Sequence, residues 1–165
     1  MAIGGDQGGS IRIPSCWCGI CGLKPTYGLV PYTGIFPIEL TIDHAGPMAR
    51  TVADVALLLE VIAGPDGLDP RQHAGLQGAA YTRALSGEVR GLHLGIVQEG
   101  FGWKGLSEPD VDECVTQAAH AFARLGAEVK TVSIPWHRDG RHLLNAIGVE
   151  GSLATVVLGN SMGTN

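Results

Sequence analysis

Hydrophobic residues change their spacing twice along the chain, near residue 50 and near residue 91. Before residue 50 the apolar stretches are short. A strand-like stretch, MAIGG, runs directly into a glycine loop, and the prolines that follow are too close together for long helices. Short strands or extended segments such as YGLVPY fit this region.

The segment TVADVALLLEVIAG predicts an amphipathic helix. Its apolar residues recur at helical spacing, and Thr51 and Asp54 form a capping box at its start. Gly64 and Pro65 end the helix. The next segment, PDGLDPRQHAGLQG, is typical of a surface loop, and the stretch from Gly64 to Gly91 is a candidate seam between subdomains.

From Gly91 the pattern predicts a strand, a helix and a second strand. LHLGIVQ indicates a buried strand, and AEVKTVSIP indicates its partner. The helix between them, SEPDVDECVTQAAHAFARLG, opens with Ser107 and Asp110 as a capping box and ends at Gly126. Its apolar face consists of Val111, Val115, Ala118, Phe122 and Leu125. A βαβ unit of this kind favours parallel strands in an α/β sheet that helices cover.

Both ends of the sequence read as internal positions of a longer protein. The first strand has no lead-in, and EGSLATVVLGNSMGTN is an apolar segment without a partner element. We therefore expect the chain to be an internal fragment.

Composition narrows the class of protein. The chain has 165 residues, of which 45% are hydrophobic and 16% charged, as in a well-buried globular domain. A net charge of −5 without a Lys/Arg cluster argues against nucleic-acid binding. No apolar run reaches the length of a membrane span, and the N-terminus has no secretion-signal pattern. Four cysteines are too few for a disulfide scaffold, which favours a cytoplasmic location.

The glycine loop GGDQGGSIRIP carries the strongest chemical signal. Its glycines allow positive φ angles and let another group approach the main chain closely. Successive N–H groups in such a loop form an anion-binding nest. Ser10 follows directly, so its Oγ can attack a carbonyl carbon while N–H groups from Gln7 to Ser10 stabilise the resulting oxyanion. The loop lacks the Gly-Lys-Ser/Thr of a P-loop, and GGSIR is not the Gly-x-Ser-x-Gly elbow of α/β-hydrolases.

A longer stretch around this loop resembles the amidase signature family. GGDQGGSIRIPSCWCGICGLKPTYGLVPYTG is similar to the family's Gly-Gly-Ser-Ile-Arg-x-Pro, Cys-Gly and Leu-Lys-Pro-Thr segments, and TIDHAGPMARTVADVALLL continues the match. GGDQGGS and PYTGIFPIE look more like the enantioselective amidases of nitrile pathways than like the glutaminyl-tRNA amidotransferase subunit. The resemblance is strong over residues 1 to 70 and looser to residue 165.

The resemblance implies an α/β fold with three layers, α/β/α, and a mixed central sheet. Residues 1–165 would form a partial amidase signature domain, incomplete in this chain. Residues 1–70 would be the signature core with the nucleophile loop, and residues 91–165 the βαβ segment.

The resemblance also implies roles for individual residues. Ser10 matches the family's nucleophile, and Asp6 and Arg12 match positions that support the loop, through a charge-assisted hydrogen bond. The matching oxyanion-hole donors are the backbone N–H groups of Gln7, Gly8, Gly9 and Ser10. The family's relay serine, held by a cis peptide bond, and its base lysine lie upstream of this loop, so neither is assigned in this chain.

The expected function is hydrolysis of a carboxylic amide to the acid and ammonia through an acyl-enzyme on Ser10, without metal or organic cofactor. The expected partner is a small-molecule amide, with no nucleic acid or membrane, and the full-length enzyme could form a homodimer. Two alternatives remain open. One is an amidotransferase-type subunit that passes ammonia to a second site, and the other is a truncated fragment that is inactive on its own.

Other residues that could act as the catalytic base have less support in the sequence. Lys24 lies in the Leu-Lys-Pro-Thr segment, which does not hold the family's catalytic lysine. Asp43 and His44 are adjacent, so they rarely aim at one another as a Ser-His-Asp triad requires, and a structural turn before Gly46-Pro47 is expected instead.

The remaining candidate site residues are the four cysteines and two histidines. Cys16, Cys18, Cys21 and the distant Cys114 do not have the paired spacing of a zinc site, and the first three lie in an apolar stretch. We expect buried, reduced thiols. His137 and His142 are five residues apart and receive no role.

Overall fold

The computed structural model describes residues 1–157 of the chain, which fall into two compact units. Unit 1 runs from Met1 to Ser86 and resumes at Leu144, and unit 2 runs from Gly87 to Leu143. The last part of the apolar C-terminal segment, from residue 158 on, lies outside the described residues.

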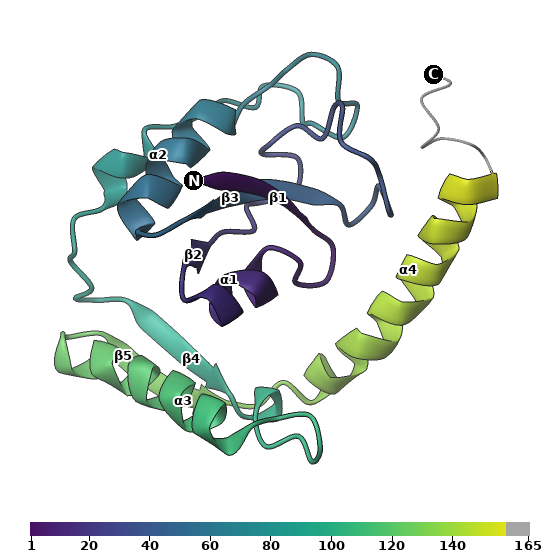
Figure 1. Cartoon of the computed structure of the whole chain (residues 1–165). Helices are drawn as coiled ribbons and strands as arrows, with labels where there is room; N and C mark the ends of the chain where they lie inside the picture. The colour runs from purple at the N-terminus through teal and green to yellow at the C-terminus, as the bar shows by residue number, and fades with distance from the viewer. Residues whose placement is uncertain (158–165) are drawn as a thin grey trace. The chain divides into compact units, whose positions relative to one another are not determined.

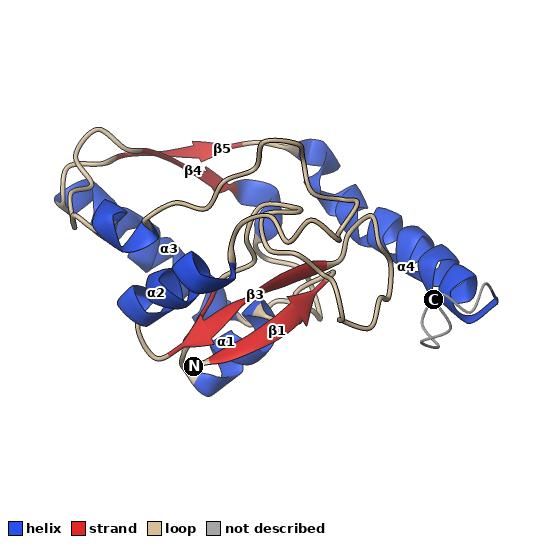
Figure 2. Ribbon diagram, turned by 90° about the horizontal axis from the view of Figure 1, so that it is seen from above, coloured by secondary structure: helices blue, strands red, loops and turns tan. Residues whose placement is uncertain are grey.

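Unit 1 contains a small antiparallel sheet (Figures 1 and 2). Its strands are β1 (Ala2–Asp6), β2 (Cys21–Gly22) and β3 (His44–Ala49), and their order is β1-β3-β2. The predicted N-terminal strand is therefore confirmed as β1. The expected turn at Asp43-His44 is wrong, because His44 begins the central strand β3 and pairs with Asp6. YGLVPY forms turns and no strand.

Two helices accompany this sheet. α1 (Arg12–Cys18) follows the glycine loop directly and is a short helix that the proline spacing did not reveal. α2 (Val52–Ile62) confirms the predicted helix, since the Thr51 hydroxyl accepts the Asp54 N–H at 3.1 Å and donates to the Asp54 carboxylate at 2.8 Å. The core cluster of unit 1 consists of Val30, Tyr32, Ala45 and Leu59.

The loop after α2 is less superficial than the sequence suggests. Asp69 is buried, and its carboxylate accepts the backbone N–H of Tyr32 at 2.8 Å. The Arg71 side chain pairs with Asp69 at 2.7 Å and donates to the carbonyl of Asp43 at 3.0 Å. A loop that reads as polar surface thus fastens the segment that leads into β3.

Unit 2 contains the predicted βαβ arrangement. β4 (His93–Val97) and β5 (Glu128–Val132) pair in parallel, and α3 (Pro109–Arg124) connects them. The Ser107–Asp110 capping box is wrong: Glu108 occupies the N-cap without a side-chain bond, and the Ser107 hydroxyl donates to Asp112 instead.

Burial in unit 2 is shallower than the pattern predicts. β4 is only partly buried, and α3 buries none of its residues among the described part of the chain. The large residues of its apolar face are between 39% (Phe122) and 61% (Leu125) exposed. Two paired strands cover only a small part of such a face.

α4 (Gly140–Val157) is the last described element, and it gives the apolar C-terminal segment a partner. From Leu144 on it belongs to unit 1. The Thr155 hydroxyl donates to the Ile38 carbonyl at 3.3 Å, and a Cβ added at Gly151 would lie 2.0 Å from the Glu39 carboxylate. The expectation that this segment lacks a partner is therefore wrong for its described part.

Candidate active site

Ser10 lies at the end of the glycine loop, between β1 and α1. β1 ends at Asp6, and α1 begins at Arg12, so the chain reverses within five residues. Gly9 makes this possible with a φ of 133°, a backbone conformation that favours glycine. Ser10 is exposed, and its hydroxyl has no hydrogen-bond partner among the described residues. The hydroxyl is therefore accessible to a substrate and to a base from elsewhere.

The carboxylate of Asp6 holds the loop together. Asp6 is fully buried, and its two oxygens accept the N–H groups of Gly9 at 2.8 Å and Ile11 at 3.1 Å. The Arg12 guanidinium donates to both oxygens, at 3.0 and 2.9 Å, so the expected charge-assisted bond between Asp6 and Arg12 is present. The Arg12 backbone N–H donates as well, at 3.4 Å, so five donors from the next six residues converge on one carboxylate.

The ionisation of Asp6 reflects these donors. Burial alone would raise its pKa, but hydrogen bonds from Arg12, Ile11 and Gly9 outweigh burial and lower the pKa from 3.8 to about 2. Asp6 is consequently a carboxylate at neutral pH and acts as an acceptor for the loop.

One predicted oxyanion donor needs correction. The Gly9 N–H already donates to Asp6, so it is not free to bind a substrate oxygen. The N–H groups of Gln7, Gly8 and Ser10 make no hydrogen bond with the described residues. These three remain the predicted donors.

Ile11, the residue after Ser10, anchors this end of the loop. Its side chain is 0% exposed and fits against three glycines, one from each strand of the sheet: Gly4, Gly22 and Gly46. A Cβ at any of the three would lie 3.0 to 3.1 Å from an Ile11 carbon. No spacing in the sequence connects Ile11 with Gly22 and Gly46, because only the fold brings them together.

A second set of contacts fixes the start of the loop. The Gln7 side-chain amide donates to the Tyr32 hydroxyl at 3.2 Å. Tyr32 is buried, and the Arg71 guanidinium lies 4.8 Å from its ring centroid. Gln7 is therefore connected to the Arg71–Asp69 ion pair, which has no obvious signal in the sequence.

The cysteines near the loop are not the buried thiols that we expected. Cys16 and Cys18 are exposed, Cys21 is half-buried, and the neighbouring Trp17 is 83% exposed. The phase of α1 explains the first of these: Ile11 and Ser15, one turn apart, are buried, so Cys16 and Trp17 point away from that face. Cys18 is the last residue of the helix. Cys114, on α3, is exposed as well.

The rival bases have other partners. The Lys24 ammonium donates to the Pro25 carbonyl at 3.1 Å, and His44 Nδ1 lies 2.7 Å from the Ile42 carbonyl. Asp43 is fully buried and accepts the Ile38 N–H at 2.9 Å. Neither side chain of the Asp43-His44 pair is therefore bonded to the other, and both serve the local chain.

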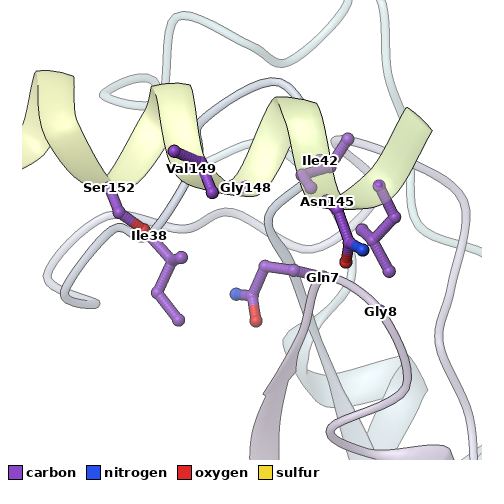
Figure 3. Close-up of a pocket in the computed structure, with 9 residues that line it drawn as sticks. Gln7, Gly8, Ile38, Ile42, Asn145, Gly148, Val149 and Ser152 are labelled. Carbon is purple, nitrogen blue, oxygen red and sulfur yellow. The ribbon is translucent and has the colours of Figure 1, made fainter. Parts of the chain in front are cut away.

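A groove of about 520 Å³ adjoins the glycine loop within unit 1 (Figure 3). Gln7 and Gly8 lie at its base, and Ile38 and Ile42 come from the segment before β3. The other wall is α4, which contributes residues between Leu144 and Ser152. We call this space the α4 groove.

Two kinds of feature are absent from the described part of the chain. Within residues 1–157, no helix combines the length and apolar character needed to cross a bilayer. The same residues contain no group of three or more His, Cys, Asp or Glu side chains that could hold a metal ion.

Comparison with known proteins gives consistent matches. The family described as Amidase matches residues 1–159. The chain is 50% identical to an enantioselective amidase from Rhodococcus rhodochrous, over 99% of this chain and 31% of that protein.

Solved structures agree. The crystal structure of a glutamyl-tRNA(Gln) amidotransferase subunit from Thermotoga maritima superposes with a TM-score of 0.85 at 31% identity, over 94% of this chain and 33% of that one. A bacterial aryl acylamidase of the amidase signature family superposes with a TM-score of 0.79 at 28% identity, over 99% of this chain and 34% of that one.

The chain spans about a third of the length of these relatives. Its expected α/β class and its likeness to the amidase signature fold are confirmed for that third. The match extends beyond residues 1–70, since it includes unit 2 and all of α4. By sequence and by structure, the chain belongs to the amidase family.

Proposed function

We propose that the chain carries the nucleophile and the oxyanion loop of a serine amidase that hydrolyses a carboxylic amide to the acid and ammonia. The observation that carries the proposal is the loop itself. Ser10 is exposed beside three uncommitted N–H groups, and the Asp6 carboxylate fixes the backbone between them. Preorganised donors of this kind contribute about 3 kcal/mol each to stabilising an oxyanion.

The proposed reaction has two halves. Ser10 Oγ attacks the amide carbonyl carbon while its proton passes to the relay serine and base lysine, which the family resemblance places upstream of this chain. The oxyanion accepts hydrogen bonds from Gln7, Gly8 and Ser10. The C–N bond then breaks as the relay protonates the leaving nitrogen, and water hydrolyses the Ser10 ester by the same route.

A chimera tests this proposal. Residues 1–165 would replace the matching third of the Rhodococcus rhodochrous enantioselective amidase, to which they are 50% identical. We expect amide-dependent ammonia release that Ser10→Ala lowers by at least about 10⁴-fold, because the nucleophile is lost. Ser107→Ala, which removes a hydroxyl in unit 2, is the matched control. A folded chimera without turnover, or turnover that survives Ser10→Ala, would contradict the proposal.

The 165 residues alone should have no significant turnover, since neither the relay serine nor the base lysine is assigned to them. Hydrolysis by the isolated chain, lost on Ser10→Ala, would overturn this expectation and return Lys24 to consideration as a base. A cytoplasmic location and a homodimer of the whole enzyme remain parts of the proposal.

A second candidate is an amidotransferase-type subunit that passes its ammonia to another site. The TM-score of 0.85 with the Thermotoga maritima protein favours it. Dependence of glutamine hydrolysis on partner subunits and tRNA would identify this function.

A further inference from the structure

The α4 groove and the glycine loop share residues. Gln7 and Gly8, which provide two of the three predicted oxyanion donors, also line the base of the groove (Figure 3). α4 touches the loop at Gly8, where an added Cβ would lie only 2.7 Å from a methyl carbon of Leu144. A carbonyl group held by the loop donors therefore has the groove beside it.

The lining of the groove is mostly apolar. Ile38 and Ile42 form one wall, and Leu144 and Val149 stand on α4 opposite them. The polar members are amides and a hydroxyl, and none of the described residues that line the groove is charged. Its volume of about 520 Å³ lies within the range of small-molecule sites, about 300 to 1,000 Å³.

Two glycines of α4, three residues apart, have opposite surroundings. Gly151 packs against the segment before β3, since an added Cβ would lie 2.0 Å from the Glu39 carboxylate. Gly148 lines the groove, and an added Cβ there would meet nothing within 4 Å. The first glycine lets α4 approach this segment, and the second leaves the groove open.

We propose that the α4 groove binds the acyl group of an amide substrate, that it selects apolar acyl groups, and that Gly148 sets the largest acyl group that fits. This inference rests on the proposed function, because it takes the loop donors as the place of the carbonyl. Burial of an apolar acyl group supplies the binding energy. A zwitterionic acyl group such as that of glutamine finds no charged partner in the groove and would lose its hydration.

The test uses the 165-residue chain and amides as probes. Titration of the ¹⁵N-labelled chain with 2-phenylpropionamide should shift the backbone signals of Gln7, Gly8 and Val149. Acetamide and glutamine should bind at least tenfold more weakly. Gly148→Leu, which fills the groove, should weaken 2-phenylpropionamide binding at least tenfold, because single methylene groups in such pockets change selectivity by about 10- to 200-fold.

Matched variants separate groove filling from helix effects. Gly148→Ala should give a smaller loss and also improves helix propensity, so it keeps the test valid where the leucine disturbs folding. Gly140→Leu makes the same change on α4 at a position that does not line the groove and where an added Cβ also meets nothing, and it should leave binding unchanged.

The outcomes distinguish the two proposals. No binding, shifts located away from the groove, or binding that Gly148→Leu and Gly148→Ala leave intact would overturn the groove proposal. Ser10→Ala should bind the probe as the unmodified chain does. Groove binding without Ser10-dependent turnover in the chimera would defeat the proposed function alone. Ser10-dependent turnover whose acyl preference ignores Gly148→Leu would defeat the groove proposal alone.

Discussion

Unit 1 and unit 2 build their structure in different ways. Unit 2 has regular elements, a parallel strand pair and a 16-residue helix, yet that helix buries no residue among those described. Unit 1 has shorter strands and long irregular segments, yet it contains a core cluster and the fully buried carboxylates of Asp6 and Asp43. The regularity of the secondary structure therefore does not show where the backbone is held most tightly. The backbone is held most tightly around Ser10, where buried polar groups fix irregular segments.

We expect the largest difference in stability between the units when a strand glycine is replaced by alanine. Gly46 in β3 has no room, since an added Cβ would lie 2.2 Å from the Leu23 carbonyl oxygen. Gly95 in β4 would meet only the Val132 side chain, at 3.1 Å. We expect Gly46→Ala to cost on the order of 3 kcal/mol of unfolding free energy, because backbone must move, and Gly95→Ala to cost less than about 1 kcal/mol.

Amide hydrogen exchange measures this contrast for each unit separately. Exchange in β3 should accelerate in Gly46→Ala while exchange in β5 stays near its original rate. Equal losses for the two alanine variants would show that the two units are equally constrained and would break the comparison.

The second largest effect that we expect is a loss of stability at low pH. The pKa of Asp6 is lowered from 3.8 to about 2, so the stability that its ionisation provides is complete above about pH 4 and disappears as the pH falls through 2. The loss should reach about 2 kcal/mol, at 1.36 kcal/mol per pKa unit for this fully buried group. Urea unfolding at about pH 5 and about pH 1.5, on either side of both pKa values, measures it. Asp6→Asn should remove this part of the acid sensitivity of unit 1 and leave the part due to Asp69, whose pKa the hydrogen bond from Arg71 also lowers. A variant as acid-sensitive as the original chain would refute the assignment.

The smallest difference in stability is expected for substitutions at the starts of α2 and α3. Thr51 caps α2 through the Asp54 N–H, whereas α3 begins without a side-chain cap. Thr51→Ala should cost about 1 kcal/mol, and Ser107→Ala less than about 0.5 kcal/mol. Thermal unfolding of the two variants distinguishes them, and a larger loss for Ser107→Ala would show that the Ser107–Asp112 bond stabilises the start of α3 more than the Thr51 cap stabilises α2.

Local patterns predicted the parts of the fold that short-range physics determines. β1, α2 and the parallel β4–β5 pair follow from hydrophobic spacing and capping residues near one another in sequence. The resemblance predicted the Asp6–Arg12 contact correctly because the whole loop lies within a few residues, and its assignment of Ser10 stays a prediction. What it could not show is that the Gly9 N–H is already used by Asp6.

The missed features all depend on distant residues. The Ile11 site requires Gly22 and Gly46, and the Gln7 side chain reaches Tyr32, 25 residues away. The exposure of Cys16 follows from the phase of α1, a helix of seven residues that is too short to show a hydrophobic period in the sequence. No spacing rule reports such contacts, because the chain must first fold to create them.

The Asp6 carboxylate also bears on the order of folding. Its donors lie three, five and six residues ahead, so the loops that must close are among the shortest in the chain. Contacts of such low sequence separation form early and at little entropic cost. We therefore expect the backbone around Ser10 to take its shape before the sheet beneath it is complete, so that the glycine loop is a starting point for assembly.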